Sequence, residues 1–154
     1  MLEYSVSATF EKIFLVIFLS SIIGFEREIR HKGAGLRTHI LVGVSAALVA
    51  LTSLYLSDIY KGTNIDPSRL LHGVITGIGF LCAGTIIRAG NQISGLTTAA
   101  SLWTVSCIGI AVGAGQYFAA IVFTITVVLV LLGVRYIEDF LNRSQKGGEG
   151  NGSL

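Results

Sequence analysis

The chain has 154 residues, of which 52% are hydrophobic and only 13% are charged, and its net charge is +2. A soluble domain carries roughly 25% charged residues, so this composition excludes a soluble protein. The small positive charge forms no basic stripe, so the expected partner is the lipid bilayer and not a nucleic acid. We therefore expect an all-α integral membrane protein, folded as a compact bundle of five transmembrane helices over residues 6–136.

The first expected span covers residues 6–25. It has to include Glu11 and Lys12, because the uncharged run from Ile13 to Phe25 is too short to cross a bilayer alone. Lys12 can extend its ammonium group to the lipid headgroups. We place Glu11 in the outer interface, and the alternative is a functional carboxylate within the membrane.

A dense block of charge follows, between Gly24 and His39. Its charged side chains are Glu26, Arg27, Glu28, Arg30, Lys32 and Arg37. Short loops rich in Lys and Arg stay on the cytoplasmic side of a membrane. The block therefore predicts which end of the bundle faces the cytoplasm.

Four further spans are expected at residues 39–56, 69–87, 96–112 and 117–136. Asp66-Pro67 is typical of a helix start, since Asp caps the free amides and Pro takes the first helical position. A short turn-rich loop at 88–95 should join the third span to the fourth. The polar residues 137–154 end in a glycine-rich run and are expected to form a disordered tail.

The distribution of positive charge predicts the topology. Of the 11 Lys and Arg residues, eight lie on the side of the charged block and three on the other. Because five spans place the termini on opposite sides, we expect the N-terminus outside and the C-terminus in the cytoplasm.

Small residues recur in the spans at four-residue spacing, which permits close helix packing in lipid. We expect six glycines to serve this packing: Gly73, Gly77, Gly79, Gly84, Gly109 and Gly113. The three glycines Gly77, Gly79 and Gly84 can also allow a kink in the third span.

One group of polar residues should meet at a cytoplasmic mouth, because each member borders a span on that side: Glu26, Arg27, Arg37, Thr38, His39, Arg88, Thr97 and Thr98. Charges at this depth need partners, so we expect an ion pair of Glu26 with Arg37 or Arg27. One interpretation is anchoring by positive charge. The other is a partner surface or a pocket for an anionic group, on Arg37, Arg88 and the first amides of the fourth helix.

A second polar group, Asp66, Arg69 and His72, should lie on the external side. Asp66 and Asp58 can offer oxygen ligands to hydrated Mg²⁺, but helix capping explains Asp66 without a metal. We therefore predict no metal site and no cofactor, with direct Mg²⁺ binding as the alternative.

The fourth span carries several hydroxyl groups, including Ser101 and Thr104. These can bond across helices or back to the preceding turn. No nucleophile–base pair, P-loop or HExxH helix is recognisable, so we expect no enzymatic activity.

Five ordered motifs occur between about residues 13 and 134: Gly24-Phe-Glu-Arg-Glu28, Ala34-Gly-Leu-Arg-Thr-His39, Asp66-Pro-Ser-Arg69, Gly77-Ile-Gly-Phe-Leu81 and Gly95-Leu-Thr-Thr-Ala-Ala-Ser-Leu-Trp103. Together they resemble the MgtC/SapB family. The resemblance implies a multi-pass protein of the bacterial cytoplasmic (inner) membrane, linked to low magnesium, stress adaptation and virulence. It implies no settled biochemical activity.

Two features depart from the family pattern. Cys82 stands where a glycine is expected, and the chain ends in a short tail where MgtC-type members carry a soluble C-terminal domain. We therefore expect a minimal form of the family, to which no role of that domain transfers.

The leading hypothesis is a non-enzymatic regulator that contacts another membrane protein complex or forms a homo-oligomer. The alternative is a small transporter or channel for Mg²⁺ or another cation, with Glu26, Arg37 and the glycine-rich third helix as its path.

Topology provides the first test. A reporter fused after Arg143 should be read out in the cytoplasm, because the excess of Lys and Arg holds that side of the protein inside. An external signal from this fusion would contradict the predicted orientation.

Overall fold

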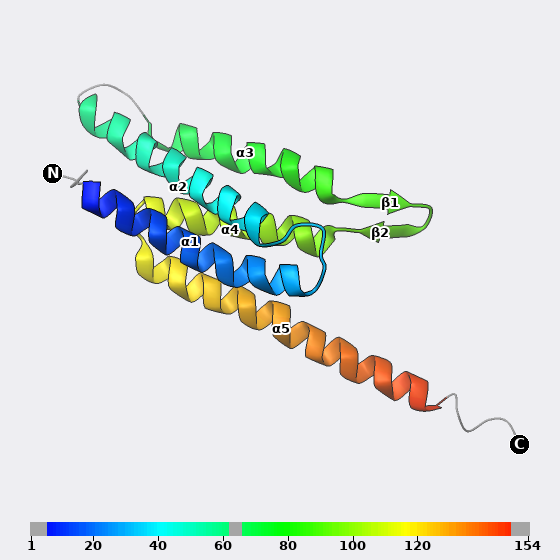
Figure 1. Ribbon diagram of the computed structural model, residues 1–154. Helices are drawn as coiled ribbons and strands as arrows, with labels where there is room; N and C mark the ends of the chain where they lie inside the picture. The colour runs from blue at the N-terminus through cyan, green and yellow to red at the C-terminus, as the bar shows by residue number, and fades with distance from the viewer. Residues whose placement is uncertain (1–5, 62–65, 149–154) are drawn as a thin grey trace, which may run out of the picture.

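The computed structural model describes residues 6–61 and 66–148, with the backbone alone at 135 and 137–148. Within these residues the chain forms five α-helices and one β-hairpin (Figure 1). In chain order they are α1 (Val6–Ile29), α2 (Leu36–Ile59), α3 (Ser68–Thr85), β1 (Ile87–Ala89), β2 (Gln92–Ser94), α4 (Leu96–Gly113) and α5 (Tyr117–Gly148). The expected all-α bundle is confirmed, and the hairpin is an addition to it.

α4 forms the centre of the bundle and contacts each of the other four helices. More than half of its length, 56%, is buried, against 11% for the apolar part of α5. Its buried residues Val105, Ile108 and Val112 pack in one cluster with Val16 and Ile23 of α1. A helix that is apolar and buried on most sides is typical of the core of a membrane bundle.

The helices α2 and α4 approach each other closely at two glycines of α4. A methyl group added at Gly113 would lie 2.7 Å from the carbonyl oxygen of Ala47 and 2.8 Å from Cβ of Ala50. One turn earlier, a methyl at Gly109 would overlap the carbonyl oxygen of Gly43. The structure thus places Gly109 and Gly113 in the kind of small-residue contact that holds helices together in lipid.

The expectation for the glycines of the third helix is wrong within the described chain. At Gly73, Gly77, Gly79 and Gly84 an added methyl would meet nothing within 4 Å. α3 contacts α2 and α4 through another face, which carries the buried residues Ile78 and Cys82. The spacing identified small residues correctly but could not tell which face of α3 turns toward the bundle. Cys82 itself packs well, because its thiol donates to the carbonyl oxygen of Ala99 at 3.1 Å.

Among residues 6–61 and 66–148, four helices are long and apolar enough to cross a bilayer: α1, α2, α4 and the 117–134 part of α5. α3 begins and ends close to the expected span at 69–87. It is not among these four, and its first two turns carry Arg69 and His72. It runs beside α2 and α4 as the fifth member of the bundle (Figure 1).

The connection between α3 and α4 is a hairpin and not the loop that we expected at 88–95. β1 and β2 pair in antiparallel register, with Ile87 opposite Ser94. Gly90 adopts a φ of +61 at the first position of the two-residue turn, as tight hairpins require. Gly95 then starts α4 with a φ of +88, and a side chain there would overlap the carbonyl oxygen of Thr85.

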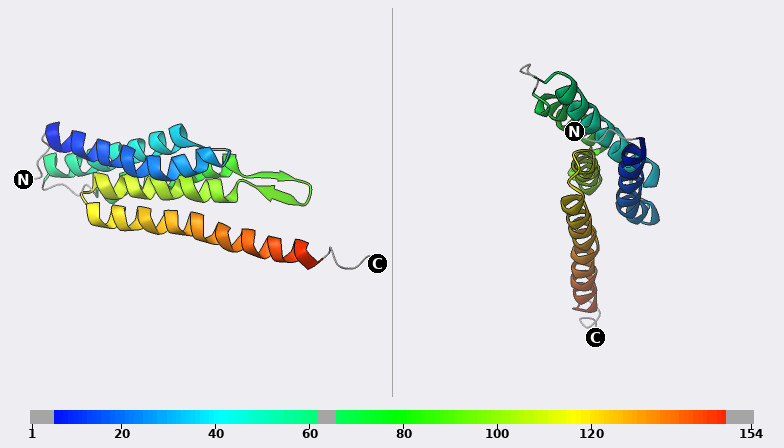
Figure 2. Two further views of the ribbon diagram at one scale, coloured as in Figure 1. Left: turned by 60° about the horizontal axis from the view of Figure 1, so that its bottom comes forward. Right: turned by 90° about the vertical axis from the view of Figure 1, so that its left-hand side faces the viewer.

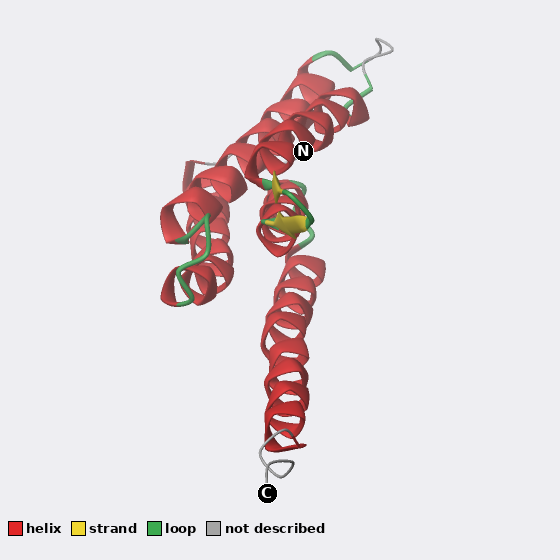
Figure 3. Ribbon diagram, turned by 90° about the vertical axis from the view of Figure 1, so that its right-hand side faces the viewer, coloured by secondary structure: helices red, strands yellow, loops and turns green. Residues whose placement is uncertain are grey.

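The expected tail is also corrected, since α5 continues as a helix to Gly148 instead of ending at 136. The sequence from 137 onward has no proline, and Ile137, Phe140 and Leu141 recur at helical spacing, so nothing local stops the helix. Residues 149–154 lie outside the described chain. Toward its C-terminal end α5 diverges from the other helices (Figure 2), and Figure 3 shows the same divergence from the hairpin end.

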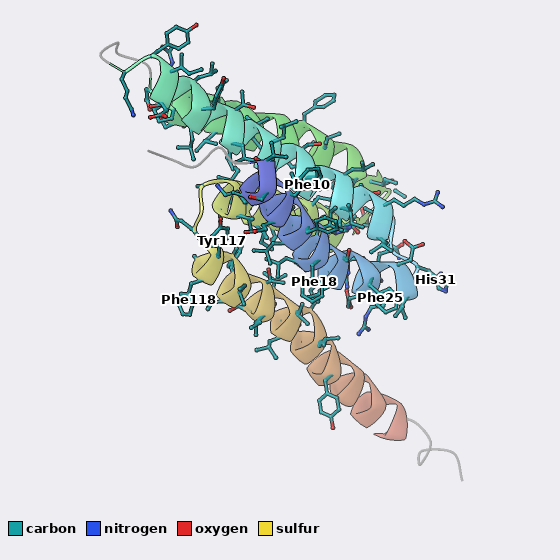
Figure 4. The ribbon with its side chains drawn as sticks, turned by 60° about the vertical axis from the view of Figure 1, so that its left-hand side comes forward. Phe10, Phe18, Phe25, His31, Tyr117 and Phe118 are labelled. Carbon is teal, nitrogen blue, oxygen red and sulfur yellow. The ribbon has the colours of Figure 1, made fainter. Side chains whose placement is uncertain are left out.

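α1 presents a row of phenylalanines on the side opposite its buried face. Phe10, Phe14, Phe18 and Phe25 are exposed, and their spacing places them on one helical face. Figure 4 labels three of them, Phe10, Phe18 and Phe25. At the start of α1, the ammonium of Lys12 donates to the carbonyl oxygen of Gly113 at 3.1 Å. Lys12 therefore satisfies the last turn of α4, where a cation is favoured, instead of only extending to headgroups.

Close packing at Gly109 gives a stability prediction. Gly109→Ala should lower the free energy of unfolding in detergent micelles by about 1–3 kcal/mol, because the methyl group overpacks the α2–α4 contact. Gly133→Ala on α5 is the matched control, since a methyl there meets nothing within 4 Å. Equal stability of the two variants, followed by circular dichroism during unfolding, would argue against the contact.

Candidate functional site: a buried histidine and a cationic groove

Three segments of the chain meet at one end of the bundle. These are the connection between α1 and α2, the hairpin, and the first turn of α4, which all lie at the same end in Figure 1. This end contains the charged block and is the one that the sequence assigns to the cytoplasm. The residues of the predicted cytoplasmic mouth are found here, but some are buried in hydrogen bonds and ion pairs while others are exposed.

His39 is fully buried, at 0% exposure, in the first turn of α2. Its Nδ1 lies 2.7 Å from the carbonyl oxygen of Gly35, one turn earlier. Its Nε2 lies 3.0 Å from Oγ of Ser101 on α4. The Ser101 hydroxyl is also 2.8 Å from the carbonyl oxygen of Thr98. The imidazole therefore joins the start of α2 to the first turns of α4.

The partners of His39 determine how its protons are arranged. A carbonyl oxygen only accepts, so Nδ1 carries a proton and donates it to Gly35. In the neutral ring Nε2 then accepts from the Ser101 hydroxyl. If the ring gains a second proton, Nε2 donates to Ser101, whose hydroxyl is left to donate to Thr98. Both ring nitrogens therefore have a hydrogen-bond partner in the neutral and in the doubly protonated ring. The Ser101 hydroxyl donates to Nε2 in the first case and to the carbonyl oxygen of Thr98 in the second.

Glu26 is the centre of a small ion-pair group at the C-terminal end of α1. Its Oε2 lies 2.5 Å from Nε of Arg27, and its Oε1 pairs with Nε of Arg30, one turn further along. Arg27 is buried at 4% exposure. Of the two partners that we expected for Glu26, Arg27 is therefore right, and Arg37 is wrong because its side chain is exposed on α2.

Glu28 caps the start of α2, which the sequence did not predict. Its Oε2 accepts from the backbone N–H of Leu36 at 2.9 Å. The carboxylate thereby satisfies a free donor at the start of α2 and opposes the positive end of the helix dipole. Since the two residues are eight apart across a loop, no local capping signature could have indicated this bond.

The remaining predicted residues divide into two sets. Thr98 is buried at the start of α4, whereas its neighbour Thr97 is exposed. Arg37, Thr38 and Arg88 are exposed. Nε of Arg88 donates to the carbonyl oxygen of Gly90 in its own hairpin, at 3.3 Å. Neither Arg37 nor Arg88 is among the residues that line the groove described next, and the anion pocket that they would build with α4 stays a prediction.

A groove nevertheless exists at this end, between α1 and α5, with a volume of about 1180 Å³. We call it the α1–α5 groove. Its lining comes from three segments: residues between Ile22 and Lys32, between Ile93 and Thr98, and between Val128 and Val134. Its cations are Arg27, Arg30 and Lys32. Arg30 and Lys32 belong to the charged block but were not singled out from the sequence.

The external group lies at the opposite end of the bundle. Asp66 accepts from both the N–H and the hydroxyl of Ser68, each at 2.8 Å, which supports the capping interpretation. Both bonds hold the pKa of the Asp66 carboxyl below its usual value, and the bond from the Ser68 hydroxyl has the larger effect. Arg69 and His72 are exposed. No three His, Cys, Asp or Glu side chains gather as a metal site among residues 6–61 and 66–148.

The chain is similar to a family of known proteins. A model described as the MgtC family matches residues 13–140. The "Putative magnesium transporter YhiD" of Escherichia coli (strain K12) is 41% identical over 123 residues, which is 78% of this chain and 57% of that protein. "Protein MgtC" of Brucella abortus (strain 2308) is 42% identical over 112 residues, covering 73% of this chain and 45% of the relative.

"Protein MgtC" of Salmonella choleraesuis (strain SC-B67) is 37% identical over 134 residues, covering 87% of this chain and 55% of the relative. The chain thus spans about half the length of the curated relatives that it matches. No solved structure is significantly similar to it.

The bond between His39 and Ser101 gives a second stability prediction. Ser101→Ala should cost about 1–2 kcal/mol in the free energy of unfolding, because it leaves a buried imidazole nitrogen without a partner. The control is Ser45→Ala, at an exposed position on α2. It should change the free energy of unfolding by less than about 0.5 kcal/mol. Thermal unfolding in detergent measures both, and equal effects would show that the bond contributes nothing.

Proposed function

The chain belongs to the MgtC family, and on that premise we propose that it is a non-enzymatic membrane regulator that acts through helix–helix contact. It is a multi-pass membrane protein, and its relatives are bacterial, which supports a place in a bacterial inner membrane. The name of its relative YhiD includes magnesium and supports a role in adaptation to low magnesium. The proposed contact surface is the outer face of α3.

One observation carries this proposal: α3 has a glycine face on which no residue of the described chain packs. Gly73, Gly77, Phe80 and Gly84 follow one another at intervals of four, three and four residues, so they share one side of the helix. The three glycines are open, and Phe80 between them is 83% exposed. The buried residues Ile78 and Cys82 of α3 lie on the opposite side.

Such a face suits contact with a second helix. In lipid, helices gain little from burying apolar surface, so they associate where small residues let two backbones approach closely. The spacing Gly73-xxx-Gly77 is the pattern that permits this approach. Within this chain, α2 and α4 already pack closely in this way at Gly109 and Gly113. A partner helix, from another protein or from a second copy, can therefore pack on α3 as α4 packs on α2.

The alternative is a cation transporter, which the name of YhiD favours. The expected path would need Glu26, Arg37 and the glycines of α3 to line one passage. Glu26 is instead paired with Arg27 on α1 and with Arg30 directly after it, and Arg37 is exposed on α2. The α3 glycines face away from the bundle. This separation makes the regulator the better supported proposal.

The test places a photo-crosslinking amino acid at Thr76, an exposed position at the edge of the glycine face of α3. In intact bacterial membranes, it should capture one recurring partner, either a second copy or one other membrane protein. Gly77→Leu should reduce that capture roughly fivefold, the equivalent of about 1 kcal/mol of interhelical packing. Quantitative mass spectrometry of the crosslinked bands measures the change.

Two controls accompany this test. Gly133→Leu alters an equally open glycine on α5 and should leave the capture unchanged. The melting temperature of Gly77→Leu should not fall below that of the parent, since a Cβ atom at this position meets nothing within 4 Å in the described part of the chain. Capture that is insensitive to Gly77→Leu, or crosslinks from Thr76 to lipid alone, would refute the proposed contact surface.

A further inference from the structure

The α1–α5 groove has an apolar floor built by two helices. α1 contributes Phe25 and Ile29, which are 57% and 61% exposed, and α5 contributes Leu132, which is 44% exposed. The groove volume of about 1180 Å³ exceeds the roughly 300–1,000 Å³ of a pocket for a drug-sized molecule. It therefore has room for much more than a small inorganic ion.

The rim of the same groove is cationic. Arg27, Arg30 and Lys32 line it, with Glu26 as the carboxylate among the lining residues. Glu26 already serves two arginines, Arg27 and Arg30. The Nη1 atom of Arg30 and the Oε1 atom of Glu26 are both buried without a hydrogen-bond partner within the described chain, although Nε of Arg30 forms an ion pair with that oxygen. A guanidinium nitrogen in that state is suited to an added oxyanion, which it binds with strong, charge-assisted hydrogen bonds.

The two parts of the groove follow one another along the membrane normal. From Phe25 to Arg30 the helical rise is about 7 Å, so Phe25 lies deeper in the span than Arg30 and Lys32. Arg27 and Ile29 lie between these two levels. The adjoining first turn of α4 also lines the groove at Leu96, Thr97 and Thr98, and no side chain caps that turn. Free N–H groups at a helix start favour an anion as well.

We infer that the α1–α5 groove binds an anionic phospholipid from the cytoplasmic leaflet. The phosphate lies at Arg30 and Lys32, and an acyl chain lies between α1 and α5 against Phe25 and Leu132. An anionic headgroup fits because the rim holds three cations against one carboxylate, and basic pockets between transmembrane helices recognise such lipids. A zwitterionic lipid would bring its own cation to this rim. The inference does not depend on α3 or on the proposed function.

The experiment uses the full chain, purified in a non-ionic detergent, with dioleoyl phosphatidylglycerol as the probe and native mass spectrometry as the readout. Dioleoyl phosphatidylcholine and inorganic phosphate are the comparison ligands. Phosphatidylglycerol should bind at one saturable site, at least about fivefold more tightly than phosphatidylcholine. Excess inorganic phosphate should not displace it, because phosphate alone cannot occupy the apolar floor.

Matched charge removals locate the site. Arg30→Gln should weaken phosphatidylglycerol binding about five- to tenfold. Lys32→Gln, at an exposed position on the rim, should weaken it about fivefold without affecting folding. Arg88→Gln removes a cation from the hairpin at the same end of the bundle, outside the groove lining, and should leave the affinity unchanged.

Three results would overturn the inference. The first is equal binding of the two lipids, and the second is an effect of Arg88→Gln as large as that of Lys32→Gln, which would mean general surface attraction. The third is binding of inorganic phosphate as tight as that of the lipid, which would make the rim a site for a free anion. If Arg30→Gln fails to fold, Lys32→Gln alone decides the outcome.

Discussion

The close approach of α2 and α4 is the constraint on which the rest of this bundle depends. The backbones meet where Gly109 and Gly113 face Gly43 and Ala47, with no space for an added methyl group. In a bilayer, where burial of apolar surface between helices gains little, such backbone contact provides much of the association energy. It makes α4 the central helix, and the other helices are arranged around it.

The candidate site is an extension of that contact toward the charged end. His39 and Gly43 lie one turn apart on α2, and both are buried against α4. The imidazole bonds to Ser101 where the two helices begin, while Glu28 satisfies the start of α2. α5 diverges from the bundle (Figure 2), so the neighbouring cations of α1 are left beside a groove instead of a packed helix. The hydrogen bonds of His39 and Glu28 and the α1–α5 groove thus lie at the same end of the bundle.

The sequence predicted the five helices because long apolar runs, Asp66-Pro67 and the charged block are local signals. It also identified His39, Arg27 and Thr98 as members of one group, since each borders a span on the same side. It could not predict bonds between distant residues, such as Glu28 with Leu36, or the pairing of β1 with β2. Nor could four-residue spacing tell that the glycines of α4 face inward while those of α3 face outward, because periodicity defines a face but not its direction. That outward face now supports the proposed function.

The central claim is that the chain acts by contact and does not carry ions. Its most direct test is Mg²⁺ flux into liposomes that contain the purified protein and an enclosed magnesium indicator. The account predicts the same flux as in protein-free liposomes of the same lipid composition, across a gradient of either direction. Saturable Mg²⁺ entry that rises with the amount of protein and is lost in Arg37→Ala would contradict it.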